Sequence, residues 1–190
     1  MPTPVSIVAL SGSLRRGSLN TALLRAAAAT AGNGVQIDVA TPRGIPLYDG
    51  DLEASEGIPE AVSELKERIV AADGLMIATP EYNNSMPGVL KNAVDWLSRP
   101  PKDIPRVFRD RPVAVTGASP GGFGTTLAQS SWLPVLRGLR MRPWFGGRLM
   151  LSKAGDAFAD DGTLTDEERR KQLAEFVAGF AAFIRAGKAG

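Results

Sequence analysis

The chain has 190 residues, of which 44% are hydrophobic and 22% are charged, and its formal net charge is +2. This size and composition predict a single globular domain over residues 1–190, and the near balance of charge argues against a nucleic-acid-binding surface. The absence of cysteine and histidine excludes disulfides, cysteine nucleophiles and the commonest zinc ligands, so we expect no metal site. The N-terminus lacks the features of a signal peptide and no apolar stretch is long enough to cross a bilayer, which predicts a cytoplasmic protein without membrane contact.

Short apolar segments alternate with helical patterns along the chain. Strands are predicted at residues 5–10, 35–39, 75–79, 112–116 and 140–145, the last at an edge of the sheet because it contains Pro143. Helices are predicted at 21–29, 58–72, 87–98 and 124–138, with a bend or interruption near Pro134. A final helix begins after Leu164, where Thr165 and Glu168 match a capping box. Apolar strands joined by helices predict an α/β fold, a doubly wound sandwich with a five-stranded parallel sheet.

The segment after the first strand, residues 11–20 (loop one), has the composition of an anion-binding site. It precedes a helix, whose N-terminal N–H groups favour a negative charge. Its hydroxyl and guanidinium donors are Ser11, Ser13, Ser18, Arg15 and Arg16. The alternative is an ordinary turn, since turns also select glycine and serine.

Loop one departs from both common nucleotide-binding motifs. Gly12 and Gly17 have the spacing of a P-loop, but Ser18 and Leu19 replace its lysine and its magnesium-binding hydroxyl residue. Leu14 stands where the dinucleotide fingerprint needs its second glycine. A single terminal monophosphate is therefore the phosphate group that this loop favours.

Two further loops follow strands of the predicted sheet. Residues 79–88 (loop three) carry Glu81, Tyr82, Asn83 and stiffening prolines, which suit a flat heteroaromatic ligand. Residues 116–124 (loop four) are rich in glycine, which lets the backbone approach a planar ring. Each loop alone is equally well read as a polar surface connection. Because carboxyl ends of parallel strands share one edge of a sheet, the three loops together predict one site for phosphate, a polar linker and a planar ring.

Three segments in register resemble those of NADPH-dependent FMN reductases, which have a flavodoxin-like fold. They are Gly12-Ser13-Leu14-Arg15-x-x-Ser18-x-Asn20, then Thr79-Pro80-Glu81-Tyr82-Asn83 followed by Pro87 to Trp96, and Ser119-Pro120-Gly121-Gly122. The similarity covers nearly the whole chain and looks closest to the chromate- and quinone-reducing group. It implies the strand order 2-1-3-4-5.

The resemblance also implies which residues bind the cofactor. Those expected at the FMN phosphate and its approach are Ser11, Ser13, Arg15, Ser18, Leu19 and Asn20. Those expected at the ribityl chain and the isoalloxazine ring are Pro80, Glu81, Tyr82 and Asn83. Those expected beside the ring are Ser119, Gly121 and Gly122. No side chain is assigned as a catalytic acid or base, because hydride passes directly from nicotinamide to flavin N5.

The implied function is an NAD(P)H-dependent, FMN-containing oxidoreductase with a ping-pong mechanism. Its small-molecule acceptor is expected to be a quinone, a metal oxyanion such as chromate, an azo compound or free flavin. Two alternatives are a flavodoxin-type electron carrier and a non-redox binder of a nucleotide monophosphate. Carriers of that type are usually strongly acidic, unlike this chain with its net charge of +2.

A homo-oligomer, either a dimer or a tetramer, is also implied by the resemblance, because flavin sites in the family lie next to a neighbouring subunit. The two helices predicted at 87–98 and 124–138 add support, since they hold more apolar bulk than one sheet face needs. These apolar residues are Val89, Leu90, Trp96, Leu127, Trp132 and Leu133. Core packing is the alternative role for them.

Overall fold

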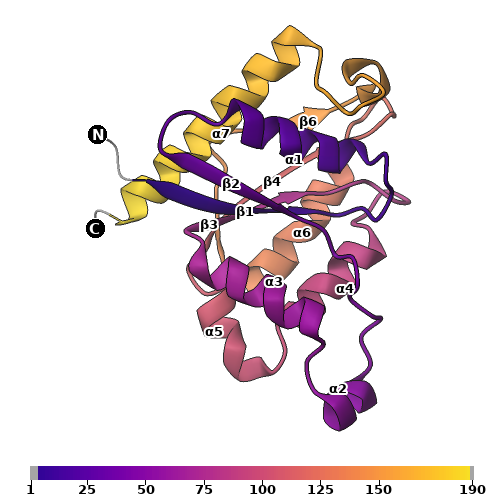
Figure 1. Ribbon diagram of the computed structural model, residues 1–190, viewed down its shortest axis with the longest axis vertical. Helices are drawn as coiled ribbons and strands as arrows, with labels where there is room; N and C mark the ends of the chain where they lie inside the picture. The colour runs from indigo at the N-terminus through magenta and orange to yellow at the C-terminus, as the bar shows by residue number, and fades with distance from the viewer. Residues whose placement is uncertain (1–3, 189–190) are drawn as a thin grey trace.

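A parallel β-sheet with helices on both faces forms the centre of the protein (Figure 1). The computed structural model describes residues 4–188. The sheet contains β1 (Val5–Ser11), β2 (Val35–Ala40), β3 (Gly74–Ala78), β4 (Pro112–Ala118) and β5 (Arg142–Pro143) in the order β2-β1-β3-β4-β5. The predicted doubly wound, flavodoxin-like α/β fold and its strand order are confirmed.

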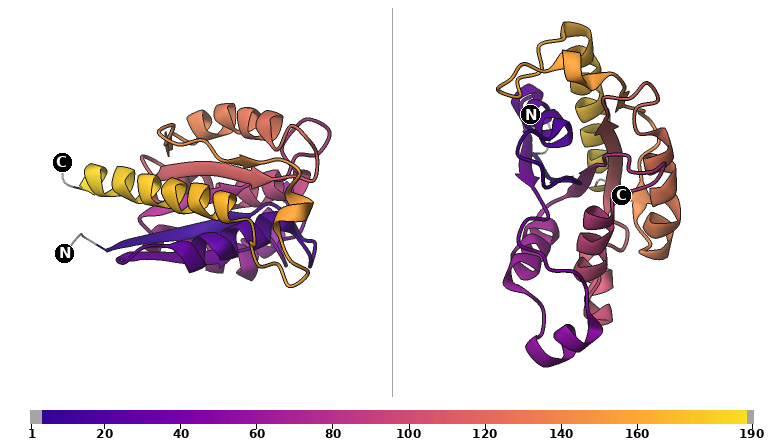
Figure 2. Two further views of the ribbon diagram at one scale, coloured as in Figure 1. Left: turned by 90° about the horizontal axis from the view of Figure 1, so that it is seen from above. Right: turned by 90° about the vertical axis from the view of Figure 1, so that its right-hand side faces the viewer.

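Each face of the sheet has its own apolar core. Alternate residues of β1 point to opposite faces, as the pleat requires. Ile7 and Ala9 pack with α1 (Leu19–Thr30) and α7 (Glu167–Lys188) on one side. Val8 and Leu10 pack on the other side with α3 (Glu60–Ala71), α4 (Gly88–Leu97), α5 (Ile104–Val107) and α6 (Thr126–Gly138). Figures 1 and 2 show the two helical layers on either side of the sheet.

Loops one, three and four meet at one edge of this sheet, opposite the edge at which β1 begins and α7 ends (Figure 2). The backbone N–H of Gly12 donates to the carbonyl of Ala78 at 2.8 Å, and that of Thr79 donates to Thr116 at 2.9 Å. A Cβ on Gly12 would lie 2.7 Å from both Pro80 Cδ and Leu90 Cδ2. Glycine is therefore required here by the close approach of loop one to loop three.

Several element boundaries differ from the prediction. Ser11 is the last residue of β1, and Leu19 and Asn20 form the first turn of α1, so loop one is shorter than residues 11–20 suggested. A peripheral helix, α2 (Gly50–Glu56), was not predicted, because it buries no side chain and so has no apolar stripe. Helix α6 continues through Pro134 without interruption.

The fifth predicted strand is mostly absent. Only Arg142 and Pro143 pair with β4 as β5, and an unpredicted strand, β6 (Met150–Leu151), pairs with the far end of β4. Between them the chain folds over the indole of Trp144, whose ring lies 5.0 Å from that of Phe176 in α7. Gly146 and Gly147 permit this, because a Cβ on either would lie 2.5 Å from the indole. Packing of Trp144 thus ends the strand expected over residues 140–145 at Pro143.

The predicted capping box at the start of α7 is wrong. The hydroxyl of Thr165 donates to the carbonyl of Ala157 at 3.2 Å, so it does not cap the helix. Asp166, one residue later, accepts the N–H of Arg169 at 3.0 Å and provides the N-cap instead. A carboxylate in this position also interacts favourably with the helix dipole.

Candidate functional site

Loop one presents hydrogen-bond donors at the N-terminus of α1. Ser18 caps this helix, with its Oγ accepting the N–H of Thr21 at 3.2 Å. The Oγ of Ser13 accepts the N–H of Arg15 at 3.3 Å. Because both hydroxyls act as acceptors in these bonds, each keeps its own O–H to donate. The guanidinium of Arg15 is exposed and makes no hydrogen bond or ion pair with residues 4–188.

Two other predicted residues of loop one use their polar atoms within the protein. Ser11 is fully buried, and its Oγ lies 2.8 Å from the hydroxyl of Thr21. Asn20 is buried as well, and its amide makes two bonds to Ala118 at the end of β4, donating to the carbonyl at 2.9 Å and accepting the N–H at 3.0 Å. These side chains connect loop one to its surroundings, and any contact they make with a cofactor remains a prediction.

The half-buried side chain of Leu19 packs against the core between the sheet, α1 and α7. Leu19 and Asn20 belong to the first turn of α1, where backbone N–H groups have no partner within the helix. Any bond from Leu19 to a phosphate is therefore expected from its backbone N–H and not from its side chain.

A basic residue that the sequence analysis did not identify lies against loop one. Arg43, in the connection after β2, donates from Nη2 to the carbonyl of Leu14 at 2.8 Å. Because β2 is the outer neighbour of β1 in the sheet, the segment after β2 lies beside loop one. The expected strand order 2-1-3-4-5, which places β2 beside β1, was the signal that could have pointed to Arg43.

Loop three forms a tight turn with an exposed aromatic ring. Tyr82 and Ser85 exchange two backbone hydrogen bonds of 3.0 Å. Between them, Asn83 and Asn84 have φ angles of 49° and 60°, the left-handed conformation that asparagine tolerates well. Tyr82 is 47% exposed and is free to pack on a planar ligand, whereas Pro80 is buried against the sheet.

The carboxylate of Glu81 is turned toward α6. Its Oε2 accepts the N–H groups of Leu127 and Ala128, at 2.8 and 3.0 Å. This long-range helix cap was not predicted from the sequence. The absence of any acidic residue in the first turn of α6 was the one available signal.

Loop four is held at its base and exposed at its tip. Ser119 donates its N–H to Leu151 of β6 at 2.9 Å, and its Oγ accepts the N–H of Gly121 at 3.1 Å. Gly121 and Gly122 are exposed, and Phe123 beside them is 89% exposed. Backbone without side chains at the tip can approach a planar ring closely.

The described residues fit FMN at this edge of the sheet. Loop one offers two serine hydroxyls, the N-terminus of α1 and unpaired Arg15, which together suit a terminal phosphate. Tyr82 and the exposed glycines of loop four suit a flat ring. Among residues 4–188 there is no group of three or more side chains placed to hold a metal ion, and no helix that is both long and apolar enough to span a membrane.

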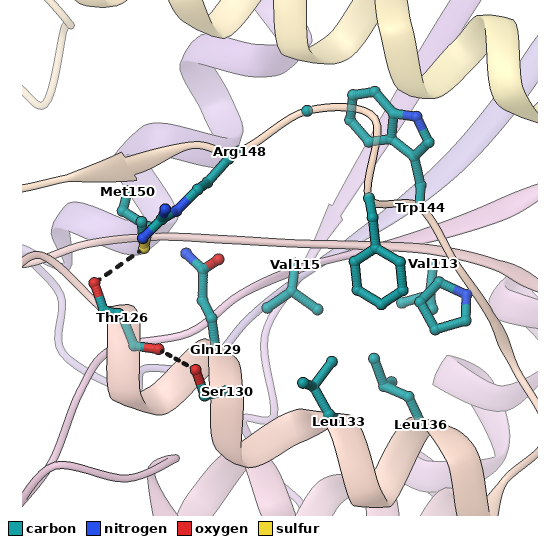
Figure 3. Close-up of a pocket in the computed structure, with 13 residues that line it drawn as sticks. Val113, Val115, Thr126, Gln129, Ser130, Leu133, Leu136, Trp144, Arg148 and Met150 are labelled. Atoms are coloured by element: carbon teal, nitrogen blue, oxygen red, sulfur yellow. Dashed lines mark hydrogen bonds between the residues drawn. The ribbon is translucent and has the colours of Figure 1, made fainter.

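A separate cavity lies beside β4, on the side of the sheet where β5 is the last strand (Figure 3). It has a volume of about 260 Å³ and lies between α6 and residues 143–150. Val113 and Val115 of β4 form its floor, and Leu133 and Phe145 form parts of its walls. None of the predicted cofactor-binding residues lines it, so it is distinct from the site formed by the three loops.

Comparison with known proteins gives a consistent result. A solved flavoenzyme, the NAD(P)H:(acceptor) oxidoreductase of Paracoccus denitrificans, superimposes with a TM-score of 0.84 and 34% identity, covering 96% of this chain and 98% of that one. An NAD(P)H-dependent FMN reductase of Pseudomonas aeruginosa is 42% identical over 185 residues, which is 97% of this chain and 98% of that protein.

Quinone reductases are found among the relatives as well. A quinone reductase of Escherichia coli K12 is 35% identical, over 97% of this chain and 98% of its own length. A 2-hydroxy-1,4-benzoquinone reductase of a Burkholderia species is 38% identical over 181 residues, which is 95% of this chain and 97% of that protein. The model of the NADPH-dependent FMN reductase family matches residues 5–156. The chain therefore belongs to the NADPH-dependent FMN reductase family, an oxidoreductase family with FMN and NAD(P)H as cofactors, as the three sequence segments predicted.

Proposed function

We propose that this protein is an NAD(P)H-dependent, FMN-containing oxidoreductase that transfers two electrons to a quinone. The observation that carries the proposal is the meeting of loops one, three and four at the carboxyl ends of β1, β3 and β4. Relatives named as quinone reductases support a quinone as the acceptor. Metal oxyanions such as chromate, azo compounds and free flavin are further candidate acceptors.

Residues of the three loops would hold FMN. Ser13, Arg15 and Ser18 bind the phosphate, together with the first N–H groups of α1. Tyr82 and the backbone of Gly121 and Gly122 border the ring. When bound, FMN supplies the hydride acceptor, so no catalytic acid or base is required from the chain.

We also propose a ping-pong mechanism, in which NAD(P)H and the acceptor bind in turn at one place. The support is that residues 4–188 form one sheet with its covering helices, with no separate nicotinamide-binding unit among them. Steady-state rates measured while both substrates vary should give parallel double-reciprocal lines. Intersecting lines, with no competition between NAD(P)H and a redox-inert quinone analogue, would show two separate pockets.

The competing functions are separated by one observation on the purified protein. An NAD(P)H-dependent reductase loaded with FMN is bleached by NADPH without any partner. A flavodoxin-type carrier binds FMN but is not bleached by NADPH alone, and a non-redox nucleotide-monophosphate binder is not yellow. Loss of the yellow colour on adding NADPH, followed by its return on adding 1,4-benzoquinone, is the expected result.

A homo-oligomer is the third part of the proposal. Leu90, Trp96 and Trp132 are fully buried in the core, so these three residues are not available for contact between copies. Leu127 and Leu133 on α6 are 47% and 46% exposed. Exposed apolar side chains of this size are frequent in interfaces between subunits.

Phe145, which shares the cavity of Figure 3 with Leu133, is 75% exposed. Light scattering should give a multiple of the 20.0 kDa chain mass. Leu133→Glu should lower that mass. A 20.0 kDa particle at micromolar concentration would contradict the proposal.

A further inference from the structure

The side chain of Glu81 connects two loops of the site. Glu81 lies in loop three, and its Oε2 accepts the N–H groups of Leu127 and Ala128 in the first turn of α6. Helix α6 begins directly after loop four. One carboxylate therefore joins loop three to the helix that fixes the end of loop four.

The start of α6 has no cap from its own side chains. Thr125, at the N-cap position, makes no side-chain cap bond, and its Oγ1 accepts from Gln129 Nε2 at 3.0 Å instead. The hydroxyl of Thr126 donates backward to the carbonyl of Phe123 at 3.0 Å. Since the first N–H groups of a helix need partners and favour a negative charge, α6 depends on Glu81 for both.

A third hydrogen bond links the same two elements, in addition to the two that Glu81 accepts. The N–H of Met86, on the other side of the Tyr82–Ser85 turn, donates to Ser131 Oγ at 3.1 Å. Loop three is thus bonded to α6 both before and after this turn. The three bonds hold the turn that carries Tyr82 against the helix that follows loop four.

We propose that Glu81 is a positioning residue for the flavin ring, which it does not itself contact through its carboxylate. By capping α6 it sets the separation of loop three from loop four, and so the width of the gap that receives the isoalloxazine. This inference rests on the proposed function. It differs from a role of Glu81 in donating a proton or a hydrogen bond to the cofactor.

Two substitutions separate these roles. Glu81→Ala removes the cap, whereas Glu81→Gln keeps an oxygen that accepts the two N–H groups and removes the charge and the titratable proton. In Glu81→Ala the dissociation constants of FMN and of riboflavin should both rise about fivefold, because binding must then order the start of α6. In Glu81→Gln both constants should stay within about twofold of the wild type.

A matched control is available in α2. Asp49 caps this helix by accepting the N–H of Asp51 at 2.9 Å, and α2 buries no side chain. Asp49→Ala removes a carboxylate cap of the same kind and should leave both flavin affinities unchanged. Ser131→Ala removes only the bond from Met86 to α6 and should raise both constants about twofold. This milder variant tests the proposal if Glu81→Ala does not fold.

The outcomes are distinct. Equal loss of affinity in Glu81→Gln and Glu81→Ala, or loss of a pH-dependent step in kcat in Glu81→Gln alone, would overturn the proposal in favour of direct participation. Unchanged flavin affinity in Glu81→Ala and Ser131→Ala, with the wild type binding FMN normally, would also overturn it and leave the proposed function intact. Failure of the wild-type protein to bind FMN would contradict both this proposal and the proposed function.

Discussion

Replacement of Arg15 with alanine tests whether loop one binds the phosphate of FMN. The Arg15 side chain is exposed and makes no hydrogen bond or ion pair with the part of the chain described, residues 4–188. Its removal should therefore change the free energy of unfolding by less than about 0.5 kcal/mol. A charge-assisted hydrogen bond to phosphate contributes about 1.5–3 kcal/mol, and exposure to water favours the lower half of that range. The dissociation constant of FMN should rise about twelve- to forty-fivefold.

Riboflavin and Arg16 provide the controls for this experiment. Riboflavin carries the same ring and ribityl chain without phosphate, so Arg15→Ala should leave its affinity unchanged when both ligands are titrated by fluorescence quenching. Arg16 lines a hollow between loop one and residues 155–162, and Arg16→Ala removes the same charge from the same loop. It should have a smaller effect on FMN than Arg15→Ala. Equal weakening of FMN and riboflavin by Arg15→Ala, or none for FMN, would refute the assignment of the phosphate to this residue.

Three further substitutions test contacts around the site and in the fold. Asn20→Ala leaves the N–H and carbonyl of Ala118 unpaired in the interior, so it should lower the free energy of unfolding by about 2 kcal/mol in urea denaturation. FMN binding should weaken as well, and unchanged stability would contradict this prediction. Gly12→Ala places a methyl group against Pro80 and Leu90 and should lower the free energy of unfolding by about 1–3 kcal/mol in urea denaturation. Unchanged stability would contradict the close approach of loops one and three. The hydrogen bond from buried Lys66 lowers the pKa of Asp103, so this pair should stabilise the fold above the ordinary aspartate pKa and cease to do so as pH falls through the lowered value. Asp103→Ala should lower the free energy of unfolding by about 2 kcal/mol at pH 7, and this loss of stability should shrink below about pH 4. A loss of stability that does not depend on pH would contradict the role of the ion pair.

The sequence predicted those features of the fold that depend on local patterns. Most strands and helices are recognised from hydrophobic periodicity within a window of about 11–18 residues, and the strand order followed from the resemblance to the FMN reductase family. The three loops were located for the same reason, since the carboxyl ends of parallel strands lie together. Loop one was predicted to be an anion site from its serines and its place before α1.

Contacts between distant segments could not be predicted in this way. Asn20 and Ala118 are 98 positions apart, and Glu81 and Leu127 are 46 apart. Nothing in the local composition says which carbonyl or which helix end a buried amide or carboxylate will reach. The missing part of the fifth strand has a similar cause, because it depends on the packing of Trp144 against α7.

Polar side chains of the three loops fall into two groups with different consequences for ligand binding. Asn20 and Glu81 have their polar atoms bonded to backbone of other segments, whereas Ser13, Ser18 and Arg15 keep donors available. The first group fixes the spacing of the loops, so replacing one of its residues should weaken the binding of any ligand that fills the gap between them. The free donors at the phosphate end should matter only to ligands that carry a phosphate. The ratio of riboflavin to FMN affinity therefore distinguishes the two groups, because it should stay constant when a spacing residue is replaced and should change when a phosphate donor is replaced.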